Sequence, residues 1–152
     1  MNLKFLSALG IVALTLSGCA SVPLESAENS AAAKAFDAPT GNNAGLYIYR
    51  DSSFGGALKK SVWLNEKCIG ETAPNIFFHL DVEGDRQHTL STESEFSPND
   101  LVLETEGGKN YFVRQYIKMG VFVGGANLEV VDPEVAKKAI ADLDLAKPGT
   151  CG

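Results

Sequence analysis

The feature that most constrains this fold is a series of short segments in which apolar and polar residues alternate, with turn residues between them. In the clearest segment, residues 110–119, one face would carry Tyr111, Val113, Gln115, Ile117 and Met119. Successive side chains of a strand point to opposite faces, so this alternation predicts a β-strand with one buried face. Similar segments recur from Gly45 to Val131, with turn pairs such as Asn65-Glu66 and Gly84-Asp85 between them. We therefore expect seven or eight short strands in an antiparallel β-sandwich.

A single helix is expected after the last strand. Asp132 is a good N-cap, and Pro133 suits the first helical position. An apolar stripe follows, and Pro148-Gly149 would end the segment; the stripe consists of Val135, Ala139, Ile140 and Leu143. The predicted fold class is thus mainly β, with one C-terminal helix from about Pro133 to Ala146.

The N-terminus has the pattern of a bacterial signal peptide. Lys4 is followed by an apolar run of 12 residues, Phe5–Leu16. This run is too short for a transmembrane helix, which needs about 20 residues, but it suits a signal-peptide core. Leu16-Ser17-Gly18-Cys19 resembles the lipobox of bacterial lipoproteins, in which the cysteine thiol receives diacylglycerol. We predict a signal peptide over 1–18 and a lipidated Cys19; the alternative is an ordinary secretory signal with an incidental cysteine.

The residues after Cys19 suggest a destination and a spacer. By resemblance to the sorting rules of Gram-negative lipoproteins, Ala20 in place of Asp points to the outer membrane, and we expect the protein to face the periplasm. Display on the outer leaflet is the alternative. Residues 19–44 are rich in Ala, Ser, Asn and Gly, which predicts a flexible tether before a sandwich domain at 45–152. The alternative is that part of this segment packs as an extra strand or helix.

Two cysteines remain once Cys19 is set aside. Cys68 and Cys151 would share an oxidising compartment, so we predict a disulfide between them. The alternative is a buried Cys68 and a free thiol at Cys151. His79 and His88 do not have the spacing of metal ligands, so no metal or cofactor is expected.

The charge balance restricts the class of partner. The 152 residues include 13 Lys and Arg and 19 Asp and Glu, a net charge of −6. An acidic chain without a basic block argues against nucleic acid as a partner.

The chain lacks the sequence patterns of common catalytic sites. It has neither a Gly-rich phosphate loop before a helix nor a nucleophile-elbow serine. Two carboxylates could in principle support glycoside hydrolysis, and the candidates are Glu93, Glu95, Glu104 and Glu106. Solvated charges on strand edges explain these four residues more simply. We therefore expect a protein that is not an enzyme.

The second face of the segment 110–119 is the best candidate for a binding surface. It carries Phe112, Arg114, Tyr116 and Lys118, with Tyr47, Tyr49 and Arg50 as expected neighbours. Exposed aromatic residues beside cations suit protein or glycan partners. The alternative is that the C-terminal helix covers this face, with Val135, Ile140 and Leu143 packed on Phe112 and Tyr116.

Several short motifs occur in a characteristic order. They are Leu46-Tyr47-Ile48-Tyr49-Arg50, Val62-Trp63-Leu64-Asn65 with Ile69-Gly70-Glu71, His88-Thr89-Leu90, and Gly108-Lys109-Asn110-Tyr111-Phe112-Val113-Arg114 with Gly120. From about Gly45 to Ala141 the chain resembles small bacterial lipoproteins carrying a domain of unknown function related to PEGA-type β-sandwich modules. The chain departs from that family in two turns, with Glu66 where Gly is usual and Glu83-Gly84-Asp85-Arg86 where Pro-Gly is usual. Since the family has no established activity, the resemblance implies only architecture and envelope location.

These observations lead to one functional expectation. The chain is predicted to be an outer-membrane lipoprotein whose β-sandwich is a non-catalytic binding or scaffold module of the cell envelope. Its partners would be the membrane, through the lipid anchor, and an envelope protein or peptidoglycan. A peptidoglycan- or glycan-binding module is the first alternative, and an envelope hydrolase is the second.

Overall fold

The structure, a computed structural model, describes residues 18–152. The predicted signal peptide up to Ser17 therefore lies outside the described residues. The elements in chain order are α1 (Ala27–Ala33), β1 (Asn43–Arg50), β2 (Lys60–Leu64), β3 (Lys67–Thr72), β4 (Ile76–Glu83), β5 (Arg86–Thr92), β6 (Asn99–Thr105), β7 (Asn110–Lys118), β8 (Gly125–Val130), α2 (Pro133–Ile140) and β9 (Asp144–Leu145).

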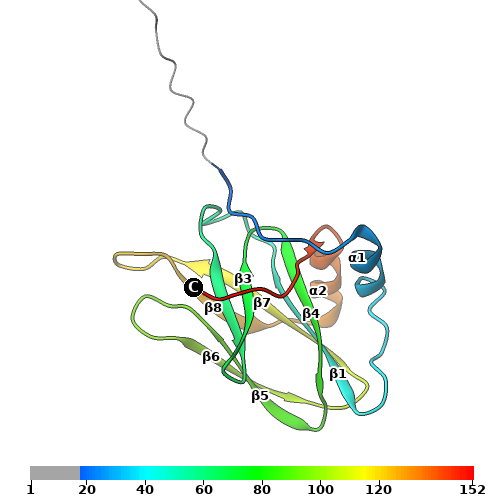
Figure 1. Cartoon of the computed structure of the whole chain (residues 1–152). Coiled ribbons are helices and arrows are strands. Elements are labelled where there is room, and N and C mark those ends of the chain that lie inside the picture. The colour runs from blue at the N-terminus through cyan, green and yellow to red at the C-terminus, as the bar shows by residue number, and fades with distance from the viewer. Residues whose placement is uncertain (1–17) are drawn as a thin grey trace, which may run out of the picture.

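The strands form two sheets, which confirms the predicted β-sandwich (Figure 1). One sheet has the order β8-β7-β1-β4-β9, and the other has the order β3-β2-β5-β6. Most neighbours are antiparallel, but β1 pairs with β7 and β4 pairs with β9 in parallel, where antiparallel pairing was predicted. Parallel neighbours need a long connection, and the chain between β1 and β7 supplies one that includes the whole second sheet.

The main core lies between the two sheets. The inward positions of the alternating segments meet there, and the central side chains are buried. They are Ala44, Leu46, Ile48, Val62, Ile69, Ile76, Phe78, Val82, Leu90, Leu103, Val113, Leu128 and Ala146. Burial of these aliphatic and aromatic side chains is the main source of the fold's stability.

A third layer of helices covers the outer face of the five-stranded sheet. Ala33 of α1 and Ala136 and Ile140 of α2 pack there in a second apolar cluster. Helix α2 begins as predicted, since the side chain of Asp132 accepts hydrogen bonds from the second and third helical N–H groups. It ends at Ile140, six residues earlier than predicted, because the following residues form β9 beside β4. Within residues 18–152 no helix is long and apolar enough to cross a membrane.

The segment predicted as a flexible tether is packed on the domain instead. The Ala20 N–H donates to the Gly56 carbonyl at 2.8 Å, and Leu24 forms a bridge with Ala146. Helix α1 follows, capped by Ser26. The structure thus has the alternative arrangement, in which part of residues 19–44 packs as a helix and an extended strand-like segment.

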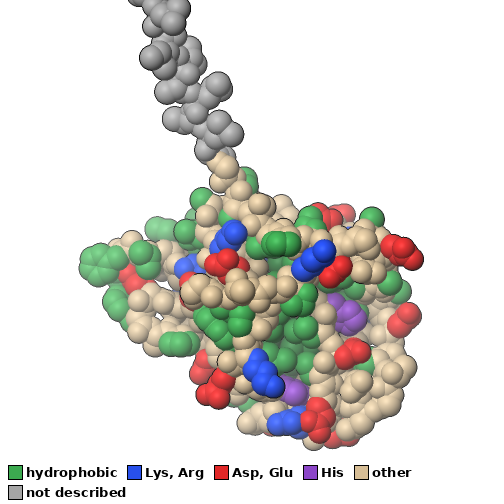
Figure 2. Space-filling model, in the orientation of Figure 1, with side chains coloured by type: hydrophobic (Ala, Val, Ile, Leu, Met, Phe, Trp, Pro, Cys, Tyr) green, Lys and Arg blue, Asp and Glu red, His purple; other side chains and the backbone are tan. Residues whose placement is uncertain are grey.

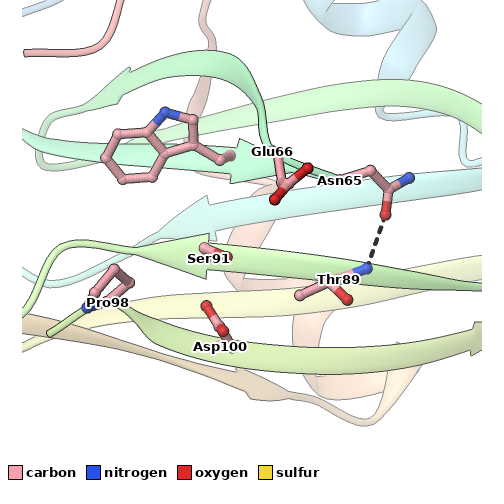
Figure 3. A pocket seen from close by; sticks show the side chains of 7 residues that line it. Asn65, Glu66, Thr89, Ser91, Pro98 and Asp100 are labelled. Carbon is pink, nitrogen blue, oxygen red and sulfur yellow. Dashed lines mark hydrogen bonds between the residues drawn. The ribbon is translucent and has the colours of Figure 1, made fainter.

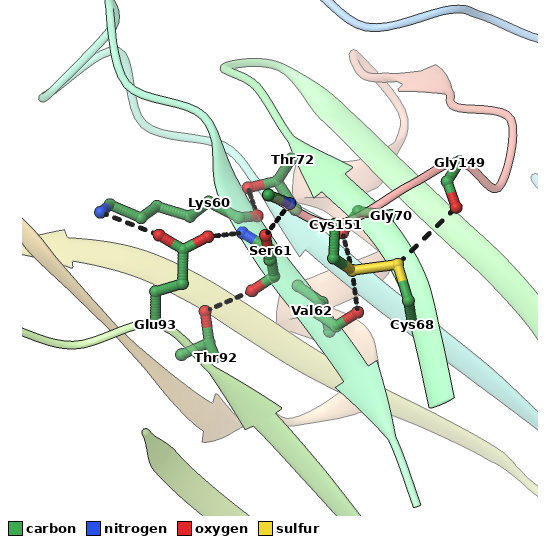
Figure 4. Close-up of a disulfide and its surroundings, with 11 residues drawn as sticks. Lys60, Ser61, Val62, Cys68, Gly70, Thr72, Thr92, Glu93, Gly149 and Cys151 are labelled. Carbon is green, nitrogen blue, oxygen red and sulfur yellow. Dashed lines mark hydrogen bonds and ion pairs between the residues drawn. A yellow bond between two sulfur atoms is a disulfide. The ribbon is translucent and has the colours of Figure 1, made fainter. Parts of the chain in front are cut away.

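The predicted disulfide joins Cys68 of β3 to Cys151 near the C-terminus (Figure 4). Their Cα atoms are 5.9 Å apart, within the usual range for a disulfide. The Gly149 N–H also donates to the Ile69 carbonyl at 2.8 Å, and the Gly152 N–H donates to Ser61 Oγ at 3.2 Å. The tail therefore lies along the edge strand β3 instead of extending into solvent.

Candidate binding groove on the open sheet

Most of the predicted aromatic-basic surface is buried, which corrects that prediction. At most 1% of the residue surface is exposed to solvent in each of Tyr47, Tyr49, Arg50 and Phe112. The helical layer buries the three aromatic residues, since both α1 and α2 lie on this face. Arg50 lies on the opposite face of β1 and is buried against the β1–β2 loop. The predicted alternative, coverage by the C-terminal helix, is correct for Ile140, which packs in the same cluster as Phe112. Leu143 joins this cluster from the segment after α2, and Val135 does not, since it is 59% exposed.

Tyr47 is at the centre of this buried aromatic cluster. Its ring centroid lies 5.0 Å from that of Phe112 and 4.3 Å from that of His79, and its hydroxyl donates to the Ala33 carbonyl at 3.0 Å. Burial, with smaller contributions from the charges of Asp81 and Asp37, raises the pKa of Tyr47 to about 12. Burial also lowers the pKa of His79, against the opposing effect of Asp81. The face therefore holds the helices on the sheet and is not available to a partner.

The polar residues of the predicted surface have separate structural roles. The guanidinium of Arg50 is fully buried and donates to the carbonyls of Leu58 at 2.7 Å and Gly55 at 2.8 Å. Burial lowers its pKa. Arg114 forms ion pairs with Asp51 and Glu129, at 2.7 and 3.2 Å.

The end of the predicted stripe, at Tyr116 and Lys118, reaches solvent. The hydroxyl of Tyr116 accepts a hydrogen bond from Asn127 at 3.1 Å, and its ring is half-buried. Lys118 is exposed at the end of β7. The structure does not bring the seven predicted residues together on one exposed surface.

The outer face of the four-stranded sheet is open and polar, and it contains a groove of about 600 Å³ (Figure 3). The helices lie on the other sheet, so outward side chains such as Trp63 of β2, Ser91 of β5 and Asp100 of β6 remain accessible. The groove is lined by Trp63, Asn65, Glu66, Thr89, Ser91, Pro98 and Asp100.

The strand register explains why a hollow forms at this place. Trp63 pairs with Ser91 and Ser91 pairs with Asp100, so the three side chains form a row across β2, β5 and β6. A short serine between an indole and a carboxylate leaves space above the sheet. Thr89, two residues before Ser91 on the same face, extends this space along β5.

The β2–β3 turn closes one end of the groove and is held by Asn65. Its backbone N–H donates to the Thr89 carbonyl at 2.8 Å, and its Oδ1 accepts from the Thr89 N–H at 2.9 Å. Its Nδ2 lies 2.9 Å from Nδ1 of His88. Because an amide nitrogen can only donate, His88 Nδ1 accepts and Nε2 donates to the Glu83 carbonyl at 2.8 Å. His88 is thus a structural support under the groove, with both ring nitrogens in use.

The groove has the chemistry of a binding site for a neutral polar ligand. An indole provides a flat apolar surface, and the amide, hydroxyl and carboxylate groups around it can form hydrogen bonds with a ligand. Glu66 and Asp100 lie on opposite sides of Ser91, and both are exposed (Figure 3). These carboxylates disfavour an anionic ligand.

The four acidic residues considered for hydrolysis have different partners. Glu93 accepts from the Ser61 N–H at 2.7 Å and pairs with Lys60. Desolvation raises its pKa, but these partners outweigh that effect and lower it, which is the opposite of what a general acid needs. Glu104 accepts from Gln87, and Glu106 pairs with Lys109. The fourth, Glu95, binds the β7–β8 loop.

In the part of the chain that the structure describes, no three His, Cys, Asp or Glu residues are grouped so that they could hold a metal ion.

The groove was not predicted from the sequence, although Trp63 lies in the Val62-Trp63-Leu64-Asn65 motif. The available signal was the polar residues at one parity of neighbouring strands, namely Thr89 and Ser91 in one segment and Asp100 in the next. Pairing of these residues with Trp63 depends on register, which the local pattern does not contain.

Comparison with known proteins identifies the family. Residues 40–126 match a family described as "Protein of unknown function (DUF2846)". The chain belongs to this family. A relative in Haemophilus influenzae (strain ATCC 51907 / DSM 11121 / KW20 / Rd), described as "Uncharacterized protein", is 57% identical over 135 residues, covering 89% of this chain and 80% of the relative. No solved structure matches. The DUF2846 match spans β1 to the start of β8, so it includes every strand that lines the groove.

Proposed function

We propose that this DUF2846 protein is an outer-membrane lipoprotein whose sandwich is a non-catalytic glycan-binding module facing the periplasm. The single observation that carries the binding role is the Trp63 groove on the uncovered sheet. A sugar ring has an apolar C–H face that can pack on an indole and peripheral hydroxyls that can pair with amide and hydroxyl groups. The resemblance to PEGA-type β-sandwich modules is part of the same proposal.

The lipid anchor is supported by the sequence around Cys19 and by the state of that residue. Cys19 is exposed and lies outside the disulfide, whereas Cys68 and Cys151 use each other. A diacylated or triacylated cysteine would hold the protein stably on a membrane, because more than one acyl chain is needed for lasting attachment. Peptidoglycan is the polymer that such an anchored module would meet in the periplasm.

The glycan role is tested by co-sedimentation of the purified full-length mature protein with peptidoglycan sacculi. Trp63→Ala should weaken binding at least about tenfold, since loss of one stacked aromatic costs about 1.5 kcal/mol. Val102→Ala is the matched control. Val102 of β6 lies on the same outer face of the sheet as Asp100, is 55% exposed and is not part of the groove lining. Equal binding by the Trp63→Ala variant and the unmodified protein would contradict the glycan role.

The anchor has its own test. Cys19→Ala should move the protein from the membrane fraction to the soluble periplasm, and mass spectrometry of the unmodified protein should detect acyl chains on Cys19. Retention of the Cys19→Ala variant in the outer membrane would contradict the proposed lipidation. A scaffold role remains the second candidate, and crosslinking in cells would support it if protein partners were captured through the groove.

A further inference from the structure

The large hydrophobic side chains that remain exposed are concentrated at one end of the sandwich. Among the described residues eleven such side chains are exposed, and seven of them lie in three loops at this end. They are Phe54 and Leu58 between β1 and β2, Phe96 between β5 and β6, and Met119, Val121, Phe122 and Val123 between β7 and β8. We call these seven residues the apolar end.

The pairing register explains why these loops meet. Strands β1 and β7 run in parallel and terminate at the same end of the sandwich. The end of β5 also lies there, because Thr92 pairs with Val62 near the start of β2. The β1–β2 and β7–β8 loops together line a hollow of about 320 Å³ that includes Phe54, Leu58 and Phe122. Figure 2 shows hydrophobic side chains gathered over the projecting β7–β8 loop at the left.

The most exposed part of the apolar end is held in a defined conformation. The carboxylate of Glu95 accepts hydrogen bonds from the N–H groups of Val121 at 2.6 Å, Phe122, and Val123 at 3.3 Å. Gly120 is required beside it, since an added Cβ would lie 1.8 Å from the Val123 carbonyl oxygen. The loop therefore presents Val121 and Phe122 outward through specific contacts, with Phe122 83% exposed.

The chain enters the domain at the same end. The Ala20 N–H donates to the carbonyl of Gly56, between Phe54 and Leu58, at 2.8 Å. Cys19 directly precedes Ala20 in the chain, so it lies next to the β1–β2 loop. The opposite end of the sandwich has a different character, because its turns carry exposed charged residues: Glu66, Glu83, Asp85, Arg86, Glu106 and Lys109.

We propose that the apolar end inserts into the bilayer that holds the acyl chains of Cys19, as a second contact made by protein side chains. This inference rests on the proposed lipidation. Aromatic and aliphatic side chains on loop tips suit the boundary between lipid headgroups and acyl chains. Lys59 and Lys118, exposed beside the loops, can approach lipid phosphates. With two contacts, the domain would have one orientation on the membrane instead of rotating about its anchor.

A fluorescent side chain in the loop tests the contact directly. The full-length acylated protein is purified from bacterial membranes as Trp63→Phe combined with Phe122→Trp, and is reconstituted into phosphatidylethanolamine and phosphatidylglycerol vesicles. Lipids brominated in their acyl chains should quench the indole at position 122 by at least about twofold and shift its emission to the blue. Trp63→Phe combined with Val102→Trp is the matched control, because Val102 is exposed but lies away from the apolar end, and its indole should be unaffected.

The outcomes separate this inference from the proposed function. If mass spectrometry finds acyl chains on Cys19 but the indole at position 122 is neither quenched nor shifted, the membrane contact is refuted while the anchor stands. If mass spectrometry finds no acyl chain on Cys19, the anchor is refuted, and the membrane contact is refuted with it because it rests on that anchor. A concentration-dependent blue shift without vesicles would indicate a second copy of the chain as the occupant and would also refute the proposal.

Discussion

Removal of the Cys68–Cys151 disulfide should strongly destabilise the domain. The two residues are 83 positions apart, so the bond closes a long loop in the unfolded chain. A loop of this length reduces unfolded-state entropy by an amount equivalent to about 4–5 kcal/mol. With a urea dependence of about 1.5 kcal/mol per molar, the midpoint of unfolding should fall by about 3 M. This loss is a large fraction of the total stability of an ordinary domain, about 5–15 kcal/mol.

The assay is urea unfolding of the full-length mature protein with Cys68→Ala and Cys151→Ala, followed by tryptophan fluorescence. The reduced unmodified protein is the control, because it lacks the crosslink but keeps both side chains, and it should unfold near the double variant. The tail's hydrogen bonds to Ile69 and Ser61 use backbone N–H groups, so the variant can retain them. A loss below about 1 kcal/mol, with equal urea dependence, would refute the argument from loop entropy.

Three further predictions concern the buried face and the β1–β2 loop. Phe112→Ala should lower the free energy of unfolding by about 3–5 kcal/mol in thermal or urea unfolding, whereas Lys118→Ala should change it by less than about 0.5 kcal/mol; equal effects would show that this face is not buried. Burial raises the pKa of Tyr47 from 10 to about 12. The stability that the protonated hydroxyl contributes is therefore complete below pH 10 and is lost as the pH rises towards 12. Tyr47→Phe should remove part of this alkaline loss of stability in unfolding curves measured at each pH. Arg50→Met should leave three loop carbonyls, those of Phe54, Gly55 and Leu58, without their donor. Hydrogen exchange in residues 51–59 should therefore accelerate while the β1 amides stay protected; unchanged exchange in the loop would contradict this role.

The sandwich could be predicted from the sequence because each strand has a local signal. The alternation in residues 110–119 identifies β7, and Asn65-Glu66 identifies a tight turn, with both residues at positive φ in the structure. The parallel pairing of β1 with β7 could not be predicted in this way, since local patterns describe a strand but not its partner. A chain long enough to connect parallel strands was present, but it consisted of other strands instead of a helix.

The predicted binding surface failed for a related reason. Alternation correctly separated the two faces of β7, but it could not show that Phe112 faces a second apolar layer. Part of that layer comes from the segment predicted as a tether, where Ala33 and Phe36 contact the aromatic cluster. Small residues such as alanine give a weak hydrophobic signal in a segment rich in polar residues, even when they pack closely. The same composition therefore suits a solvated linker and a thin covering layer.

The packed N-terminal segment has a mechanical consequence for a lipid-anchored protein. A flexible tether of 25 residues would span about 28 Å on average and leave the domain free to rotate. Here Ala20, the residue after Cys19, is hydrogen-bonded to Gly56. The chain is then held against β9 by a hydrogen bond from the Glu25 N–H to the Leu145 carbonyl. If the apolar end inserts into the bilayer as proposed, the charged turns point away from the membrane. The Trp63 groove lies on the side of the sandwich between these two ends, so its opening would face sideways, along the membrane surface. A ligand in this groove would have to lie close to the membrane surface, within the height of one domain.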